Sequence, residues 1–154
     1  MSEMFKSDSL PSPRESAYGA NLIAKNGSAA GGTVRLVPRD DGLGISVYAT
    51  GLPPGRFRVV IHANGNCSSP NAFSAGAPWA PQRGAPVVLT ITAQSDGGAF
   101  LSTRIRGYKL EGADGLMGKA VVLHEASGSL DAQPGVPNGR IACGVIGPMR
   151  VLTF

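Results

Sequence analysis

The chain carries few residues that could do chemistry, and its two histidines, His62 and His124, are the main candidates. Imidazole nitrogens bind copper, zinc and iron, although an isolated histidine is by default a solvent-facing or hydrogen-bonded side chain. The two cysteines, Cys67 and Cys143, form no C-x-x-C pair, which excludes thioredoxin-like and common zinc-site spacings. A disulfide between them would imply an oxidising compartment, and their spacing leaves open whether they pair.

Other kinds of site have no signature in this sequence. We find no Ser/His/Asp arrangement, no glycine-rich loop that could hold a phosphate and no carboxylate pair. A thioether copper site is not expected, because the methionines show no paired spacing. They are Met1, Met4, Met117 and Met149.

The composition favours β-structure in one folded domain. The 154 residues include 22 Gly and 12 Pro and only 16% charged residues, so turns are frequent and long helices are disfavoured. The 42% hydrophobic content is that of a globular protein. Since the longest apolar runs are strand-sized, no segment approaches the roughly 20 residues that span a bilayer.

Nucleic-acid binding is not expected, although the net charge is +4 and the pI is about 9.4. A nucleic-acid interface needs clustered basic residues, commonly with aromatic residues between them. Here the aromatic residues are sparse and the arginines are scattered along the chain. The scattered arginines are Arg35, Arg39, Arg56, Arg58, Arg83, Arg104 and Arg106.

Short alternating segments separated by turns predict an all-β sandwich or barrel. Residues 1–19 are polar and predict a flexible tail without an apolar signal core, and residues 20–154 form the predicted domain. The turn dipeptide Asn26–Gly27 follows the first strand, and Asp96–Gly98 predicts a hairpin between Val87–Thr92 and Phe100–Ile105. Residues 63–86 and 126–139 are long loops. The predicted strands are Leu22–Ala24, Thr33–Val37, Ile45–Ala49, Arg58–His62, Val87–Thr92, Phe100–Ile105, Gly118–Leu123, Ile141–Ile146 and Val151–Phe154.

Three segments, in the right order and spacing, resemble the copper/zinc superoxide dismutase family. Residues 51–67 are similar to its G-L-x-P-G…H-x-H-x-x-G-x-C segment, and Gly118–Glu125 resembles the strand that delivers its last copper histidine. Asn138–Gly147 is similar to its R-x-A-C-G-V-I-G signature. The resemblance implies an eight-stranded Greek-key β-barrel of this type and a Cys67–Cys143 disulfide.

The same resemblance implies roles for three further residues. His62 and His124 fall on copper-ligand positions, and Arg140 stands where the family guides its anionic substrate, although a buried structural arginine is the alternative.

A disulfide would place the protein in the periplasm or outside the cell. A homodimer or a protein partner is open as well.

Several departures from the family predict that the metal site is largely dismantled. Val60 replaces the first copper ligand and Pro78 replaces the bridging histidine, and neither side chain can bind a metal. The zinc ligands have no counterpart, and Ser127–Ser129 replaces an acidic pair. Since zinc needs about four ligands, we expect no zinc.

The leading hypothesis is therefore a superoxide dismutase-like protein that is not an efficient dismutase and binds one copper ion through His62 and His124. Two nitrogen ligands favour Cu(I). Haem is a minor candidate ligand, for which Trp79, Phe57 and Phe73 would form an apolar wall beside the histidines. Two competing hypotheses are a scaffold module without metal and a weak copper-only dismutase.

Overall fold

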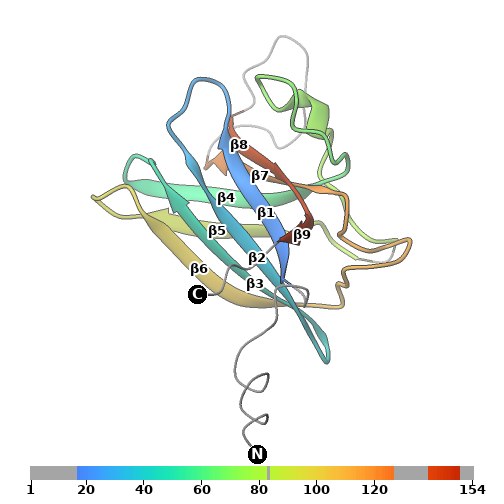
Figure 1. Ribbon diagram of the computed structural model, residues 1–154. Coiled ribbons are helices and arrows are strands. Elements are labelled where there is room, and N and C mark those ends of the chain that lie inside the picture. Colours follow the sequence, from blue (N-terminus) through green and yellow to red (C-terminus); the bar gives the residue numbers. More distant parts are fainter. Residues whose placement is uncertain (1–16, 83, 127–138, 150–154) are drawn as a thin grey trace, which may run out of the picture.

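The computed structural model describes residues 17–82, 84–126 and 139–149, which fold mainly into β-strands (Figure 1). One short 3₁₀ turn, Phe73–Ala75, lies in the long loop after the fourth strand. Within these ranges no helix is long and apolar enough to cross a bilayer. The strands are β1 (Ala17–Ala24), β2 (Gly31–Arg39), β3 (Gly42–Thr50), β4 (Gly55–His62), β5 (Val88–Ala93), β6 (Ala99–Arg106), β7 (Ala120–Glu125), β8 (Arg140–Val145) and β9 (Gly147–Met149).

The strands form one nearly closed antiparallel barrel. Each strand pairs with the next along the order β5-β4-β7-β8-β1-β2-β3-β6, and β9 also pairs with β1. Only Ile146 separates β8 from β9, so the two act as one bent strand of an eight-stranded barrel. Neighbours that are not consecutive, such as β4 with β7, are typical of a Greek key. The predicted fold class is confirmed.

Alternating side chains explain why these segments are strands. In β2, Val34 and Leu36 are buried while Arg35 between them is exposed. In the neighbouring β3, Ile45 and Val47 are buried in the same way. Side chains of a strand point alternately to its two faces, so this pattern places one face of each strand inside the barrel and the other outside.

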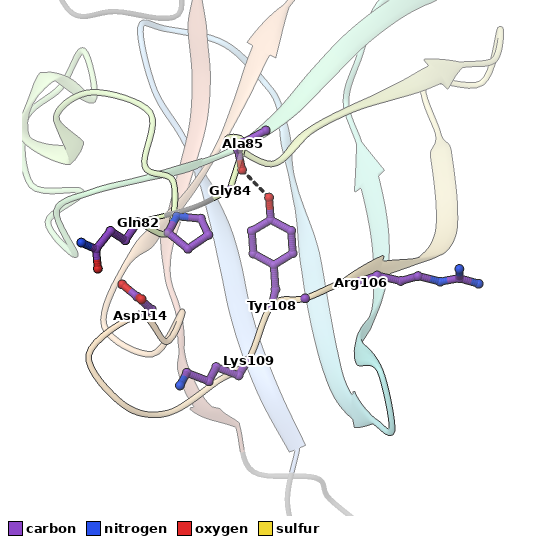
Figure 2. A pocket seen from close by; sticks show the side chains of 9 residues that line it. Gln82, Gly84, Ala85, Arg106, Tyr108, Lys109 and Asp114 are labelled. Atoms are coloured by element: carbon purple, nitrogen blue, oxygen red, sulfur yellow. Dashed lines mark hydrogen bonds between the residues drawn. The ribbon is translucent and has the colours of Figure 1, made fainter.

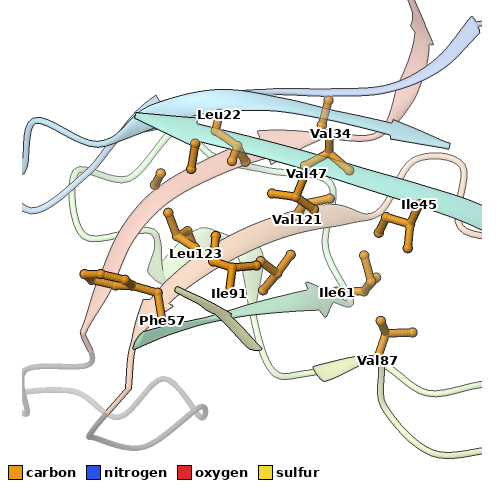
Figure 3. Close-up of a cluster of buried hydrophobic side chains, with 14 of the residues drawn as sticks. Leu22, Val34, Ile45, Val47, Phe57, Ile61, Val87, Ile91, Val121 and Leu123 are labelled. Carbon is orange, nitrogen blue, oxygen red and sulfur yellow. The ribbon is translucent and has the colours of Figure 1, made fainter. Parts of the chain in front are cut away.

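The inward-facing side chains form a continuous apolar core (Figure 3). Leu22, Val34 and Val47 come from one side of the barrel, and Ile61 and Leu123 come from the other. β4, β7 and β8 contain runs in which residues on both faces of the strand are buried. Something must therefore cover the outside of the barrel at these three strands.

The two predicted turns had different outcomes. Asn26 and Gly27 both have positive φ, 56° and 72°, so the predicted turn is confirmed. The predicted hairpin at Asp96–Gly98 is wrong, because β5 pairs with β4 and β6 pairs with β3 at opposite ends of the strand order. Hydrophobic periodicity identifies a strand but not its partner, and here the connection links the two edges of the barrel.

The chain enters the barrel slightly before the predicted boundary. β1 begins at Ala17, so residues 17–19 are already paired in the sheet. The rest of the predicted tail, the predicted strand Val151–Phe154 and most of the loop 126–139 lie outside the described residues, and these predictions remain untested.

Candidate metal centre

The two histidines reach toward each other along neighbouring strands. Val60 of β4 pairs with Val122 of β7, and His62 and His124 lie two residues beyond this pair in opposite directions. Four residues of strand correspond to about 13 Å, so only long side chains that lean toward each other can meet across that span. The rings do meet, with 2.8 Å between the Nε2 atoms, and both histidines are fully buried.

The histidines lie on the outer face of the barrel, beneath the loop 63–86. Val59 and Ile61 alternate with them and point into the main core. The outer face of β7 and β8 instead carries a second buried cluster, formed with residues of the loop. Its members are Ala72, Ala75, Ala120, Val122 and Cys143, with Cys67 packed against them. The loop is thus the cover that the doubly buried strands require.

A disulfide holds this loop onto the barrel. Cys67 in the loop is bonded to Cys143 on β8, with 5.7 Å between their Cα atoms, so the predicted pairing is confirmed. The Lys25 side chain also donates a hydrogen bond to the Cys67 carbonyl, and the backbone N–H of Asn26 donates one to the Pro70 carbonyl over 2.9 Å. The cover over the histidines is therefore anchored at several points.

Hydrogen bonds determine which ring nitrogens carry protons. Nδ1 of His62 lies 2.8 Å from the Gly76 carbonyl oxygen, which can only accept, so Nδ1 carries a proton and donates it. In the neutral ring the lone pair is then on Nε2 of His62, which accepts from Nε2–H of His124. Anchoring one ring nitrogen to a carbonyl is how metal-binding histidines commonly present the other to a metal.

The two rings meet end to end rather than face to face. Their planes are within 20° of parallel and their centroids are 5.0 Å apart. The Nε2 atoms are 2.8 Å apart, and the rest of the centroid distance is about the sum of the two distances from ring centre to Nε2. Each ring centre therefore lies almost directly behind its own Nε2 atom. Each Nε2 atom therefore points along the line that joins the two rings.

These residues do not fit the copper–zinc pair of the family that the sequence resembles. Pro78 forms an isolated β-bridge with His62, so a proline lies beside the histidine where a bridging ligand was expected. Within the described ranges, no group of three His, Cys, Asp or Glu side chains lies close enough to hold a metal. Two opposed nitrogens fit a linear, two-coordinate ion and do not fit zinc. The replacement at Ser127–Ser129 lies outside the described residues.

Arg140 has a structural contact in this position. It is fully buried at the start of β8 and donates a hydrogen bond from Nη1 to the Ala72 carbonyl over 2.9 Å. Ala72 has a positive φ of 62°, so the arginine supports a turn of the covering loop. The substrate-guiding role implied by the resemblance stays a prediction.

We expect the substitution Arg140→Met to lower the free energy of unfolding by about 2–3 kcal/mol, because the buried Ala72 carbonyl loses a charged donor. Urea unfolding at neutral pH measures the change. Arg56→Met is the matched control, since Arg56 is exposed and its replacement should change stability by no more than about 0.5 kcal/mol. Equal stabilities of the two variants would contradict a loop-anchoring role for Arg140.

Of the three aromatic residues predicted to form a wall for haem, Phe57 does not lie beside the histidines. Phe57 lies five residues before His62 on β4 and packs in the main core, on the inner face of the barrel. Trp79 is close to His62, since its amide donates to the Ile61 carbonyl over 2.9 Å, and Lys119 Nζ lies 4.5 Å from the centre of its ring. Opposite faces of one strand cannot line the same pocket.

A separate hollow of about 530 Å³ lies beside the loop that follows β6 (Figure 2). Tyr108 lines it and donates to the Ala85 carbonyl, with Gln82, Lys109 and Asp114 around the opening. Neither histidine borders this hollow. It is therefore not an entrance to the histidine pair.

Two comparisons with known proteins support the fold described above. The family model described as copper/zinc superoxide dismutase (SODC) matches residues 30–146. A solved structure titled as a crystal structure analysis of the clock protein EA4 is similar with a TM-score of 0.71 and 25% sequence identity. That similarity covers 87% of this chain and 95% of the other.

Proposed function

The chain belongs to the copper/zinc superoxide dismutase family, and from this premise we propose that it is a member without efficient dismutase activity that holds one Cu(I) ion between His62 and His124. The observation that carries the proposal is the end-to-end arrangement of the two imidazoles, with facing Nε2 atoms 2.8 Å apart. Two collinear imidazole nitrogens suit two-coordinate Cu(I) better than Cu(II), which prefers a tetragonal set of ligands.

Binding requires a small rearrangement of the pair. Metal–imidazole bonds are about 2 Å long, so the Nε2 atoms would separate to about 4 Å. His62 is ready to bind, because Gly76 holds the proton on its Nδ1 atom. His124 must give up the proton on Nε2, so uptake should release a proton or move it to Nδ1, and affinity should fall in acid.

Burial argues against dismutase turnover at this centre. Both histidines are fully buried, and Val60 and Val122 occupy the sheet between them. A dismutase needs an open position for superoxide and ligands that serve both oxidation states of copper. The chain offers no third imidazole for that purpose, since it contains two histidines.

An anaerobic Cu(I) titration in thiol-free buffer tests the proposal. We expect one equivalent to bind, and X-ray absorption to report two nitrogen neighbours at about 2 Å. Absence of binding would refute the proposal. In that case the second candidate stands, a metal-free scaffold in which the histidine pair is a structural hydrogen bond. The pair supports that interpretation because each ring already contacts the other.

We also predict that purified protein contains no stoichiometric zinc and that copper-loaded protein shows negligible dismutase activity. The physical reason is the proline at the bridging position and the absence of a three-ligand group in the described part of the chain. Elemental analysis and a direct superoxide-decay assay check both parts. Zinc bound in the barrel, or turnover near the diffusional limit, would contradict the prediction.

The disulfide supports a location in an oxidising compartment, which we propose to be the periplasm or the extracellular space. Haem remains a weaker proposal, because Phe57 packs in the main core instead of beside the histidines. A homodimer or another protein partner likewise remains a proposal. Light scattering of the purified protein tests whether it is a homodimer.

A further inference from the structure

The fold gathers four of the scattered arginines onto one surface. Arg35 and Arg39 lie on β2, and Arg104 and Arg106 lie on β6, with β3 between the two strands (Figure 1). All four occupy the positions of their strands that alternate with core residues, so they share the outer face of the barrel. We call these four residues the arginine face.

A shallow channel runs along β3 between the two pairs of arginines. The residues that β3 presents there are small, including Gly44 and Ser46. Gly44 pairs with Arg104, and a Cβ atom at Gly44 would come within 3.3 Å of Nε of Arg39. The missing side chain therefore lets the Arg39 guanidinium lie close to the backbone of β3, at the position opposite Arg104.

The surface is hollowed where these side chains meet. Cavities of about 480 Å³ and 240 Å³ lie on this part of the barrel, and Arg39 and Arg104 line both. Among the described residues, Asp41 is the carboxylate that pairs with this face, at 3.6 Å from Arg104 and 3.2 Å from Arg106. With Asp40 nearby as well, the arginine face keeps a net positive charge of about two.

Two aromatic side chains stand at the end of the channel. Tyr48 of β3 pairs with Phe100 of β6, and the side chains are 55% and 67% exposed. Residues two apart on a strand are about 7 Å apart, so successive rows follow the aromatic pair along the same face, first the two serines with Arg35 beside them and then the rows of the other three arginines. An extended ligand that carries both regular anionic groups and flat apolar surfaces would match these rows.

We propose that the arginine face, with Tyr48 and Phe100, binds a linear acidic polysaccharide that carries carboxylates. Guanidinium groups pair bidentately with carboxylates, and aromatic rings pack against the apolar faces of sugar rings. Single-stranded nucleic acid has comparable chemistry. The disulfide favours a glycan, because it belongs in an oxidising compartment where the abundant polyanions are surface polysaccharides.

The test is a titration of the full chain with oligogalacturonate of about ten sugars in about 50 mM salt, where exposed ion pairs are only partly screened. We expect Arg39→Gln with Arg104→Gln to weaken binding about tenfold, and Tyr48→Ser with Phe100→Ser to weaken it measurably. Arg56→Gln with Arg58→Gln is the matched control, because it also removes two charges but both residues lie on β4, outside the strands that carry this face. Neutral dextran of equal length should not bind.

Three results would overturn the proposal. If wild-type protein does not bind oligogalacturonate, the face has no such ligand. If the control variant loses as much affinity as the Arg39/Arg104 variant, binding reflects net charge alone. If an oligothymidine of matched charge binds more tightly through the same residues, the occupant is a nucleic acid. Circular dichroism of each variant confirms that the barrel is intact, since all substituted side chains are on the surface.

Discussion

Either His62→Ala or His124→Ala is expected to lower the affinity for Cu(I) by more than about a hundredfold. A two-coordinate ion has no spare protein ligand, so one remaining imidazole cannot hold it in competition with buffer or chelator. A competition titration with a chromophoric Cu(I) chelator measures the loss for each variant separately. If one variant keeps wild-type affinity, the shared site is wrong.

Val60→Ala is the matched control for these variants. Val60 is fully buried on the sheet between the histidines, but it has no atom that binds a metal. Its truncation should cost about 2 kcal/mol of stability and leave the copper stoichiometry unchanged. This comparison separates the loss of a ligand from general loosening of the site, because His62→Ala also removes the acceptor of the His124 hydrogen bond.

Removing the disulfide is expected to have the largest effect on stability. Cys67→Ala with Cys143→Ala should lower the free energy of unfolding by about 4 kcal/mol, because the bond joins residues 76 apart in the sequence and so restricts the unfolded chain strongly. Chemical denaturation of the double variant against oxidised wild type measures the difference. Wild-type protein treated with reductant should show a similar loss.

The disulfide variant also tests the role of the covering loop. The loop carries the Gly76 carbonyl that orients His62, so a looser loop should weaken Cu(I) binding without removing either ligand. We expect a decrease of about ten- to a hundredfold, the range typical of lost support to a metal ligand. An unchanged stability and an unchanged copper affinity would together show that the loop is held without the disulfide.

The sequence alone was sufficient for the fold class and for most strands of the described residues, although β9 was not predicted and the predicted strand Val151–Phe154 is untested. Alternation in segments such as Thr33–Val37 reports burial on one face of a sheet, and the three matched segments indicated the family. It was not sufficient for strand pairing, as the wrong hairpin between β5 and β6 shows. Each of these strands finds its partner elsewhere in the barrel, and periodicity contains no information on long-range partners.

The candidate site was identified only in part. Residue types located His62 and His124, and the family resemblance supplied the replaced ligand positions Val60 and Pro78 and the disulfide. The carbonyl oxygens of Gly76 and Ala72, which orient His62 and hold Arg140, have no sequence signature because every residue carries such a group. Phe57 was assigned to the wrong face of β4, since a position in sequence near a histidine does not place both side chains together.

By itself, the sequence determined which ligands remain: two imidazoles and two cysteines, which are too few for a copper–zinc centre. Tertiary structure decided how these groups face each other. Pairing of β4 with β7 brings His62 and His124 end to end over a valine pair. Pairing of β2 and β6 with β3 gathers Arg35, Arg39 and Arg104, scattered in the sequence, onto one face. Side-chain chemistry is a local property, whereas distance and orientation depend on strand register, which is set by pairing between distant segments.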